Sequence, residues 1–255
     1  MTSVIEWIEE KIKNDHFDEI GRGSFGKVIK ANLTNRGLVA LKIIFNDNSK
    51  EKLNEVNEEF VKELKLLREI DYHSNINHFL GVTNDSMSYI LVLEYANEGN
   101  LRDYLRNNFA SLEWNHKIQM ALDITNGLKF LHSKEIIHRD LQKLQLSSMG
   151  NKMGMYEYIE PQCIKNIKYK KDKKSDIYSL GVLLWEISSG SLPFHDYRSN
   201  RNILAIHISY NNLREEPIKG TPLKYQQLYQ KCWDDEPKLR PDIEEVYKIL
   251  NKGTQ

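Results

Sequence analysis

The hydrophobic pattern of this chain changes once, close to Asn97, and this change restricts the possible folds more than any other feature. From Phe17 to about Leu93 the apolar residues lie mostly in short runs rich in β-forming residues and separated by turn residues. One helical segment, from Glu55 to Ile70, interrupts that region. Further along, the apolar residues recur at helical spacing in the ranges 101–106, 114–131, 175–189, 223–233 and 242–250. The sequence therefore predicts an α+β chain, with a small sheet-rich part followed by a larger helical part.

Length, charge and cysteine content exclude several classes of protein. In 255 residues the 36 basic and 36 acidic side chains cancel, so the chain as a whole has no general attraction to nucleic acid or to an anionic membrane. Two cysteines, Cys163 and Cys232, are too few for the disulfide framework of a small secreted protein. No apolar stretch reaches the length of a membrane span, and residues 1–16 suit a short amphipathic helical extension better than a signal peptide. We therefore expect a soluble, cytoplasmic protein.

A glycine-rich run near the N-terminus has the pattern G-x-G-x-x-G-x-V. Glycines let backbone amides approach phosphate oxygens, because no Cβ stands in the way. Gly26 leads into a second run that reads as a strand, whereas a dinucleotide-binding fingerprint would continue into a helix. The pattern favours a phosphate-binding hairpin, and a glycine-rich hairpin without a ligand is the alternative. The candidate nucleotide-binding residues of this run are Ile20, Gly21, Arg22, Gly23, Ser24, Phe25, Gly26, Lys27 and Val28.

Lys42 lies in an apolar run, sixteen positions after Gly26. A lysine in such a strand is commonly an edge or solvated residue, but its spacing from the glycines favours a role in phosphate binding. At this point the sequence resembles the eukaryotic protein-kinase family, in which a strand lysine in a V-A-I-K context holds the α- and β-phosphates of ATP. Residues 39–42 read Val-Ala-Leu-Lys. The resemblance implies that Ala40 and Lys42 contact the nucleotide.

The resemblance also implies a glutamate on the following helix, which pairs with Lys42 and fixes its position. Glu63 is the best match because it shares a helical phase with Leu67. Glu58 and Glu59 are nearby competitors, and any one of the three could instead belong to a solvated helix face.

Residues 89–96 resemble the last strand of the family's small lobe and the hinge that follows it. The resemblance implies that backbone groups of Glu94 and Ala96 contact adenine. It also implies that Leu93 is the gatekeeper beside the nucleotide.

In the helical part, residues 138–141 read His-Arg-Asp-Leu, directly after a predicted helix. This stretch resembles the family's H-R-D motif, whose aspartate accepts or orients the proton of the substrate hydroxyl. The resemblance implies that Asp140 is catalytic, together with Lys42 and Glu63.

Residues 175–186 resemble a buried helix of the family, whose aspartate, here Asp176, braces the catalytic loop by hydrogen bonding. The matches follow the family's order from about Ile20 to Leu250. They imply a two-lobed protein-kinase fold that is partly truncated around the activation segment. The implied limits are an N-terminal helical extension at 1–16, a β-rich N-lobe with one main helix at 17–93, a hinge at 94–99 and a helical C-lobe at 100–252.

The family pattern breaks after Asp140. The family places an asparagine five positions beyond this aspartate and D-F-G further on, whereas this sequence has Gln145 and no D-F-G. Only 21 positions separate Asp140 from Pro161, which is in register with the A-P-E motif. The family needs on the order of 40 positions there. The simplest explanation is one in-frame loss of about twenty residues, beginning near Leu141 or Gln142.

Gln162 stands where the family has the glutamate of A-P-E. The basic partner implied by the family is Arg240. We expect a hydrogen bond between Gln162 and Arg240, without an ion pair.

Magnesium ions beside a triphosphate need hard oxygen ligands, which the family takes from an aspartate and an asparagine. Here no other aspartate lies between Asp140 and Asp172, and Glu157 and Glu160 belong to the substrate side of the motif. Gln145 has an amide oxygen that could bind a metal, but the residues next to it in the sequence do not match the family motif. The resemblance therefore implies ATP as the cofactor. Mg²⁺ is expected for the family, but its ligands are missing, and we predict no metal-binding residue.

Three functions remain open on this evidence. The first is a kinase-like protein that is catalytically silent or nearly so, a pseudokinase that acts as a signalling scaffold or allosteric partner. The second is an imperfect translation or alternative splice of an active kinase, which transfers the γ-phosphoryl of ATP to a Ser, Thr or Tyr hydroxyl of a protein. The third is a helical interaction module with an incidental glycine hairpin. In each case the expected partner is a protein, as substrate or signalling partner, and neither nucleic acid nor a membrane.

Overall fold

A computed structural model of the chain describes residues 18–23, 26–33, 37–45, 60–61, 63–84, 88–139, 141, 156–197 and 200–252. These residues form two compact units, and the chain passes from the first to the second between Gly99 and Asn100. The expected extension at residues 1–16 lies outside the described residues, as do Ser24, Phe25, Asp140 and Gln145. Within the described part, none of the helices combines the length and the apolarity that crossing a membrane requires.

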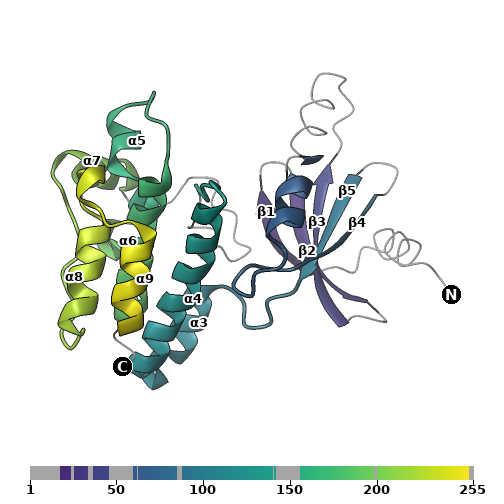
Figure 1. The fold of residues 1–255 in the computed structure, drawn as a ribbon, viewed down its shortest axis with the longest axis horizontal. Coiled ribbons are helices and arrows are strands. Elements are labelled where there is room, and N and C mark those ends of the chain that lie inside the picture. Colours follow the sequence, from purple (N-terminus) through teal and green to yellow (C-terminus); the bar gives the residue numbers. More distant parts are fainter. Residues whose placement is uncertain are drawn as a thin grey trace. The chain divides into compact units, whose positions relative to one another are not determined.

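The first unit is built on a five-stranded antiparallel sheet, coloured purple to blue in Figure 1. The strands are β1 (Asp18–Gly23), β2 (Gly26–Leu33), β3 (Gly37–Phe45), β4 (Phe79–Asn84) and β5 (Ser88–Glu94). Their order across the sheet is β1-β2-β3-β5-β4. The predicted strand that follows Gly26 and those at 38–45 and 89–93 are confirmed. The sequence pattern did not indicate β4.

Strand alternation gives this sheet two apolar faces. One face carries the buried cluster of Ile29, Ala31, Leu33, Val39, Leu41, Ile43, Ile90 and Val92. On the other face Ile44 and Leu91 pack against Phe60, which belongs to helical residues 60–61 and 63–70. Phe60 stacks on Tyr89 with ring centroids 4.3 Å apart. Because side chains two positions apart share a face, Lys42 lies on the face of Ile44, which the helix covers.

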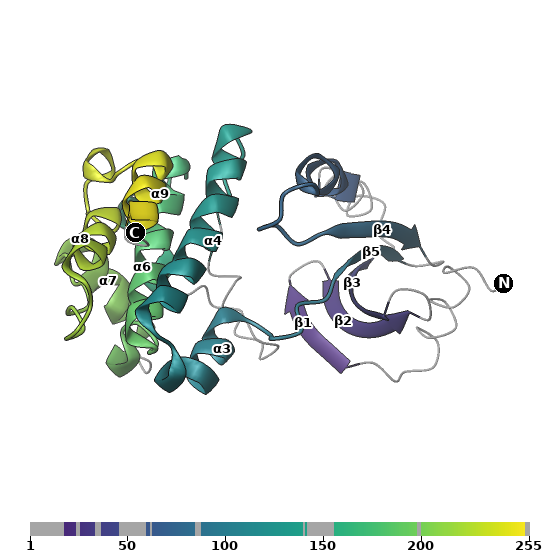
Figure 2. The same cartoon turned by 60° about the horizontal axis from the view of Figure 1, so that its bottom comes forward.

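The described part of the second unit is helical apart from its connections (Figure 2). Its α-helices are α3 (Leu101–Asn108), α4 (Trp114–Ser133), α5 (Pro161–Lys165), α6 (Lys173–Ser189), α7 (Arg201–Tyr210), α8 (Leu223–Cys232) and α9 (Ile243–Lys252). Its short 3-10 helices are η1 (Phe109–Ser111), η3 (Tyr156–Tyr158), η4 (His195–Tyr197) and η5 (Pro237–Leu239). Helix α6 packs against α4 and α8, and α5 packs against α7.

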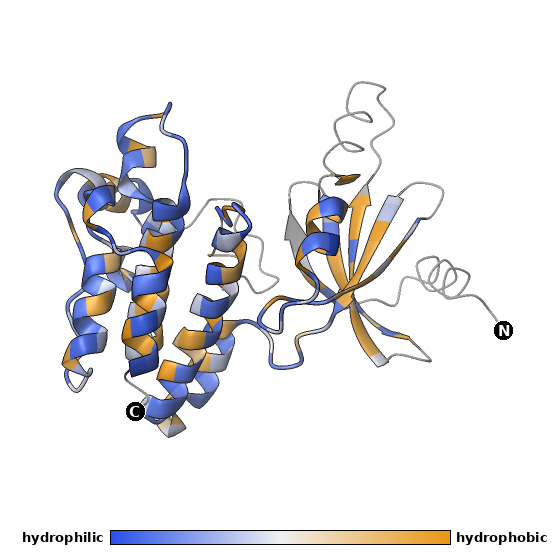
Figure 3. Cartoon of the chain, in the orientation of Figure 1, coloured by the Kyte–Doolittle hydropathy of each residue, from blue (hydrophilic) through white to orange (hydrophobic). Residues whose placement is uncertain are grey.

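Helix α6 is the centre of this unit and carries apolar side chains around most of its circumference (Figure 3). It begins where the Asp172 side chain accepts hydrogen bonds from the backbone N–H groups of Lys174 and Ser175. It ends at Gly190, whose φ of 67° is left-handed. In its middle, Gly181 lets α8 approach closely, because an added Cβ would lie 2.8 Å from the Cβ of Cys232.

In the second unit, the helices expected from the sequence correspond to α3, α4, α6, α8 and α9, and each end agrees within two residues. Helix α7 was not predicted. It buries Leu204, Ala205 and Ile208 but exposes Ile203 and Ile206, so apolar residues occur on more than one side and the helical period is obscured.

Replacing Gly190 tests the packing at the end of α6. A Cβ at this position would meet the ring of Phe109 at 2.4 Å, and φ is positive. We expect Gly190→Ala to lower the free energy of unfolding by about 3 kcal/mol, which combines left-handed strain with overpacking. The matched control is Gly220→Ala, which also has positive φ but no atom within 4 Å of the added Cβ, and should cost about 1 kcal/mol. Urea denaturation measures both, and equal costs would contradict the predicted clash.

Candidate active site

Lys42 and Glu63 form an ion pair in the first unit. Lys42 Nζ donates a hydrogen bond to Glu63 Oε1 at 2.5 Å, and the two side chains are 35% and 30% exposed. Strand alternation directs Lys42 to the face of the sheet that the helix covers. Glu63, the first of helical residues 63–70, lies over the same face. Glu58 and Glu59 lie outside the described residues. The pair holds the lysine amine in one place while leaving part of it accessible.

Three candidate nucleotide residues share one face of the sheet. Val28 pairs with Lys42 across β2 and β3, and Ala40 lies two positions before Lys42 on the same strand. Residues directly opposite each other in an antiparallel pair point to the same side. Val28, Ala40 and Lys42 therefore line one surface, with Leu93 opposite Ala40 on β5.

The glycine run forms the hairpin that the sequence indicates. Gly23 of β1 pairs with Gly26 of β2, and the register shifts between Glu19 and Gly21, where a β-bulge bends the first strand. Ile20 and Gly21 are half-buried, and so is Lys27. The backbone at Arg22 belongs to β1.

The predicted hinge begins at Glu94, the last residue of β5. The backbone N–H of Glu94 donates to the carbonyl of His78 at 2.9 Å, and its carbonyl accepts from Asn77 Nδ2 at 3.2 Å. A carbonyl oxygen has two lone pairs, so Glu94 keeps an acceptor site. The carbonyl of Ala96 accepts from Gly99 N–H at 3.2 Å, which closes a turn within the predicted hinge.

In the second unit, Asp176 braces the segment before Asp140, as predicted. Its two carboxylate oxygens accept the backbone N–H groups of His138 and Arg139 at 2.9 and 2.8 Å. The buried His132 ring also hydrogen-bonds to Asp176, at 2.9 Å. These contacts hold Arg139 at a φ of 65°, an unfavourable region for an arginine. Asp140 itself lies outside the described residues.

The expectation for Gln162 and Arg240 is wrong. Arg240 pairs with Glu160, at 2.5 Å between Nη1 and Oε1, and both side chains are fully buried. Gln162 Nε2 instead donates to the carbonyl of Asp235 at 3.1 Å. Because α5 begins at Pro161, Gln162 lies in its first turn, whereas Glu160 is the N-cap residue before the helix and its carboxylate is buried. Arg240 therefore does form an ion pair, but its partner is Glu160, two positions before Gln162.

A second buried network involves Tyr158 of the same segment. The hydroxyl of Tyr158 donates to Glu186, and Arg102 contacts Glu186 at 3.3 Å and the Tyr158 hydroxyl at 3.3 Å. Burial raises the pKa of the Glu186 carboxyl, and Arg102 opposes that effect. Burial, followed by the charge of Glu186, raises the pKa of Tyr158 well above its usual value, so the hydroxyl remains a donor.

Glu157 and Glu160, the described carboxylates of this region, do not fit a magnesium site. Besides Asp140, the only acidic residues between positions 140 and 171 are Glu157 and Glu160. Glu157 is buried against Arg201 at 3.1 Å, and Glu160 is buried against Arg240. If Glu157 turned toward a metal it would leave its ion pair with the partly buried Arg201, and if Glu160 did so it would leave the fully buried Arg240 unpaired. Across the described residues, no group of three or more His, Cys, Asp or Glu side chains is arranged to hold a metal ion.

The sequence profile of the protein tyrosine and serine/threonine kinase family matches residues 15–146 and 142–250. The chain belongs to this protein-kinase family. The two matched stretches share residues 142–146, directly after the Asp140 motif. The sheet with the helix that covers one of its faces and the helical second unit are the N-lobe and C-lobe of the protein-kinase fold.

Curated relatives of this kinase domain agree with that assignment. It is 28% identical over 257 residues to serine/threonine-protein kinase STY17 of Arabidopsis thaliana, which covers 92% of this chain and 43% of the relative. It is 31% identical over 265 residues to serine/threonine-protein kinase VIK of the same plant, covering 91% of this chain and 58% of the relative. Serine/threonine/tyrosine-protein kinase HT1, also from Arabidopsis thaliana, is 26% identical over 271 residues, covering 97% of the chain and 68% of the relative. The kinase domain thus spans less than half of STY17.

Sequence reasoning missed Glu160 and Glu186 as buried carboxylates of this kinase domain. Glu186 ends an apolar run on α6, and an isolated acid in such a run is a usable signal for a buried, paired charge. Its partner Arg102 is 84 positions away, and no pattern along the chain connects the two. No pattern in the sequence predicted that Glu160 is buried and paired, because the family motif places its glutamate at position 162.

Substitutions at Glu160 and Gln162 test the corrected pairing. Glu160→Gln leaves the guanidinium of Arg240 buried without a countercharge, so we expect the free energy of unfolding to fall by about 3–5 kcal/mol. The control Gln162→Ala removes one partly exposed hydrogen bond and should cost about 1 kcal/mol. Chemical denaturation followed by tryptophan fluorescence measures both variants. A larger loss for Gln162→Ala than for Glu160→Gln would restore the original expectation.

Proposed function

We propose that this kinase domain binds ATP but transfers its γ-phosphoryl group poorly. The observation that carries the proposal is the Lys42–Glu63 ion pair, on the same sheet face as Val28 and Ala40. A positioned amine beside a glycine hairpin suits the phosphates of a nucleotide. The reaction of the family is transfer to a Ser, Thr or Tyr hydroxyl of a protein, and the proposed substrate class follows from it.

The proposed roles of the individual residues follow their positions. Lys42 holds the phosphates, Glu63 orients Lys42, and the amides of the glycine hairpin approach the phosphate oxygens. Backbone groups of Glu94 and Ala96 contact adenine. Asp140 orients the hydroxyl of the protein substrate, on the loop whose backbone Asp176 fixes.

Poor transfer follows from the missing oxygen ligands. In the family, magnesium neutralises charge that develops on the transferring phosphoryl group. Residues 141–156 contain no aspartate or glutamate, and Glu157 and Glu160 are held by arginines. The overlap of the two profile matches at residues 142–146 supports a loss at this place, because two parts of the family pattern adjoin there without the D-F-G segment.

A pseudokinase that acts as a signalling scaffold or allosteric partner is the second candidate. The C-lobe core supports it, because the contacts of Asp176, Glu160 and Glu186 are complete without the missing segment. A fold that keeps its buried ion pairs can present a protein-binding surface without performing chemistry.

We also propose the domain limits that the sequence implies: an extension at 1–16, an N-lobe at 17–93, a hinge at 94–99 and a C-lobe at 100–252. A cytoplasmic location is part of the same proposal. Cys163 and Cys232 are both free thiols, which suits a reducing compartment.

Thermal shift with ATP, with and without Mg²⁺, tests nucleotide binding. At ten times its dissociation constant, ATP should stabilise the domain by about 1.4 kcal/mol, which raises Tm by about 4 °C. We expect Mg²⁺ to add nothing to this increase. Lys42→Ala should abolish it, and the control Lys65→Ala, an exposed lysine of the same lobe, should retain it. A further magnesium-dependent increase that Lys42→Ala removes would contradict the loss of the metal site.

Transcripts across the codons for Leu141 to Lys143 decide between the two histories of the chain. If every message lacks codons for a D-F-G segment, the loss is real. The purified protein should then transfer little radiolabelled phosphate from ATP to a protein substrate. If some messages encode a D-F-G segment, this chain is a shortened form of an active kinase. The longer form should then show magnesium-dependent transfer.

A further inference from the structure

The connection between α5 and α6 concentrates positive charge. Residues 165–174, called here the basic turn, contain six lysines and a single acid, Asp172. The chain as a whole has balanced charge, so this cluster is local. Figure 1 shows the connection projecting at the top of the helical unit, beyond the ends of α6 and α7.

Asn166 shapes the tip of the basic turn. Its carbonyl accepts the backbone N–H of Tyr169 at 2.9 Å, and its side-chain oxygen accepts the N–H of Lys168 at 3.0 Å. These two bonds place Ile167 and Lys168 at the corner of the turn. Ile167 is 97% exposed, far more than any other exposed large apolar side chain in the described residues.

The base of the basic turn is fixed to the C-lobe. The Tyr169 hydroxyl donates to the buried carboxylate of Glu160 at 3.2 Å, and burial together with Glu160 raises the pKa of Tyr169 to about 12. Lys165 pairs with Asp235 at 2.7 Å. The tip is therefore presented by a rigid base, which lowers the entropy lost on binding.

The six lysines fall into two groups. Lys165, Lys171, Lys173 and Lys174 bind protein oxygens: Asp235, the Arg139 carbonyl, Glu135 and the Arg240 carbonyl. Lys168 and Lys170 are exposed, and no ion pair of either occurs within the described residues. Two exposed ammonium groups thus follow the exposed isoleucine within three positions of the chain.

We propose that the basic turn docks the C-lobe onto an anionic phospholipid surface. Ile167 enters the interface between headgroups and acyl chains, while Lys168 and Lys170 contact the headgroup phosphates. The balanced charge of the chain led us to expect no attraction to membranes, but that average does not describe the field next to this turn. The proposal concerns the C-lobe alone and does not depend on nucleotide binding.

The shape of the turn favours a lipid surface over other anions. A protruding tip offers no groove for an acidic peptide, whereas a bilayer interface accommodates a convex apolar tip. Single-stranded nucleic acid requires aromatic side chains on which bases stack. The only aromatic residue of the turn, Tyr169, is held at its base by Glu160.

Co-sedimentation of the 255-residue chain with vesicles tests this proposal. We expect binding to vesicles that contain phosphatidylserine and none to vesicles of phosphatidylcholine alone. Removing both charges in the double variant Lys168→Ala, Lys170→Ala should weaken binding about 25-fold, because each lysine near an anionic surface contributes about fivefold. Ile167→Ser should weaken it about tenfold. Raising the ionic strength from about 0.1 M to about 1 M should release the protein.

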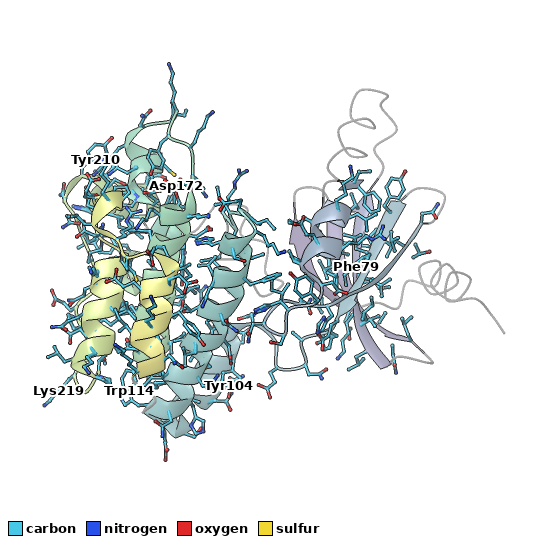
Figure 4. The ribbon with its side chains drawn as sticks, viewed as in Figure 1. Phe79, Tyr104, Trp114, Asp172, Tyr210 and Lys219 are labelled. Carbon is cyan, nitrogen blue, oxygen red and sulfur yellow. The ribbon has the colours of Figure 1, made fainter. Side chains whose placement is uncertain are left out.

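The matched control is the double variant Lys219→Ala, Lys224→Ala, which removes the same charge from two exposed lysines. Figure 4 shows Lys219 at the opposite end of the helical unit from Asp172 of the basic turn. This control should bind as the unchanged chain does, and circular dichroism should show all variants folded. Equal weakening by both double variants, equal binding to both vesicle types, or capture by poly-glutamate but not by vesicles would overturn the proposal.

Discussion

Glu160 and Arg240 carry opposite charges into the interior of the C-lobe, and both side chains are fully buried. Such a pair is stable only when the remaining donors and acceptors are satisfied. Glu160 also accepts from Ser175 and Tyr169, and Arg240 also donates to the carbonyls of Asp234, Lys174 and Asp235. One ion pair thus joins the start of α5, the start of α6 and the loop before α9. The surrounding geometry follows from the need to satisfy these two charges.

The ion pair of the N-lobe is less buried than that of the C-lobe. Lys42 and Glu63 are each about one-third exposed, so solvent screens their attraction and the pair contributes little to stability. Its value is positional, because the amine is held on the sheet face that also carries Val28 and Ala40. Because the lysine amine is already partly exposed, a charged ligand can bind it without first breaking a buried ion pair.

We propose that the loss after Asp140 affects chemistry more than architecture. In the family, the segment expected there supplies ligands to metal ions, whereas in this chain Asp176 accepts the backbone N–H groups of His138 and Arg139. The buried carboxylates after the gap are satisfied by Arg201, Arg240 and Arg102. A kinase domain can therefore keep the frame of its C-lobe while lacking the oxygens on which phosphoryl transfer depends.

The sequence alone determined the features that depend on near neighbours along the chain. Alternation assigned the strand of Lys42, helical spacing selected Glu63 and located α4 and α6, and the motif order indicated that Asp176 braces the catalytic loop. Only the tertiary structure decided the pairings between distant segments. Glu160 rather than Gln162 meets Arg240, and Arg102 meets Glu186, because side chains separated by 80 and 84 positions are brought together by helix packing. A pattern along the chain records which face a residue occupies, but the partner on that face is set by the packing of the whole unit.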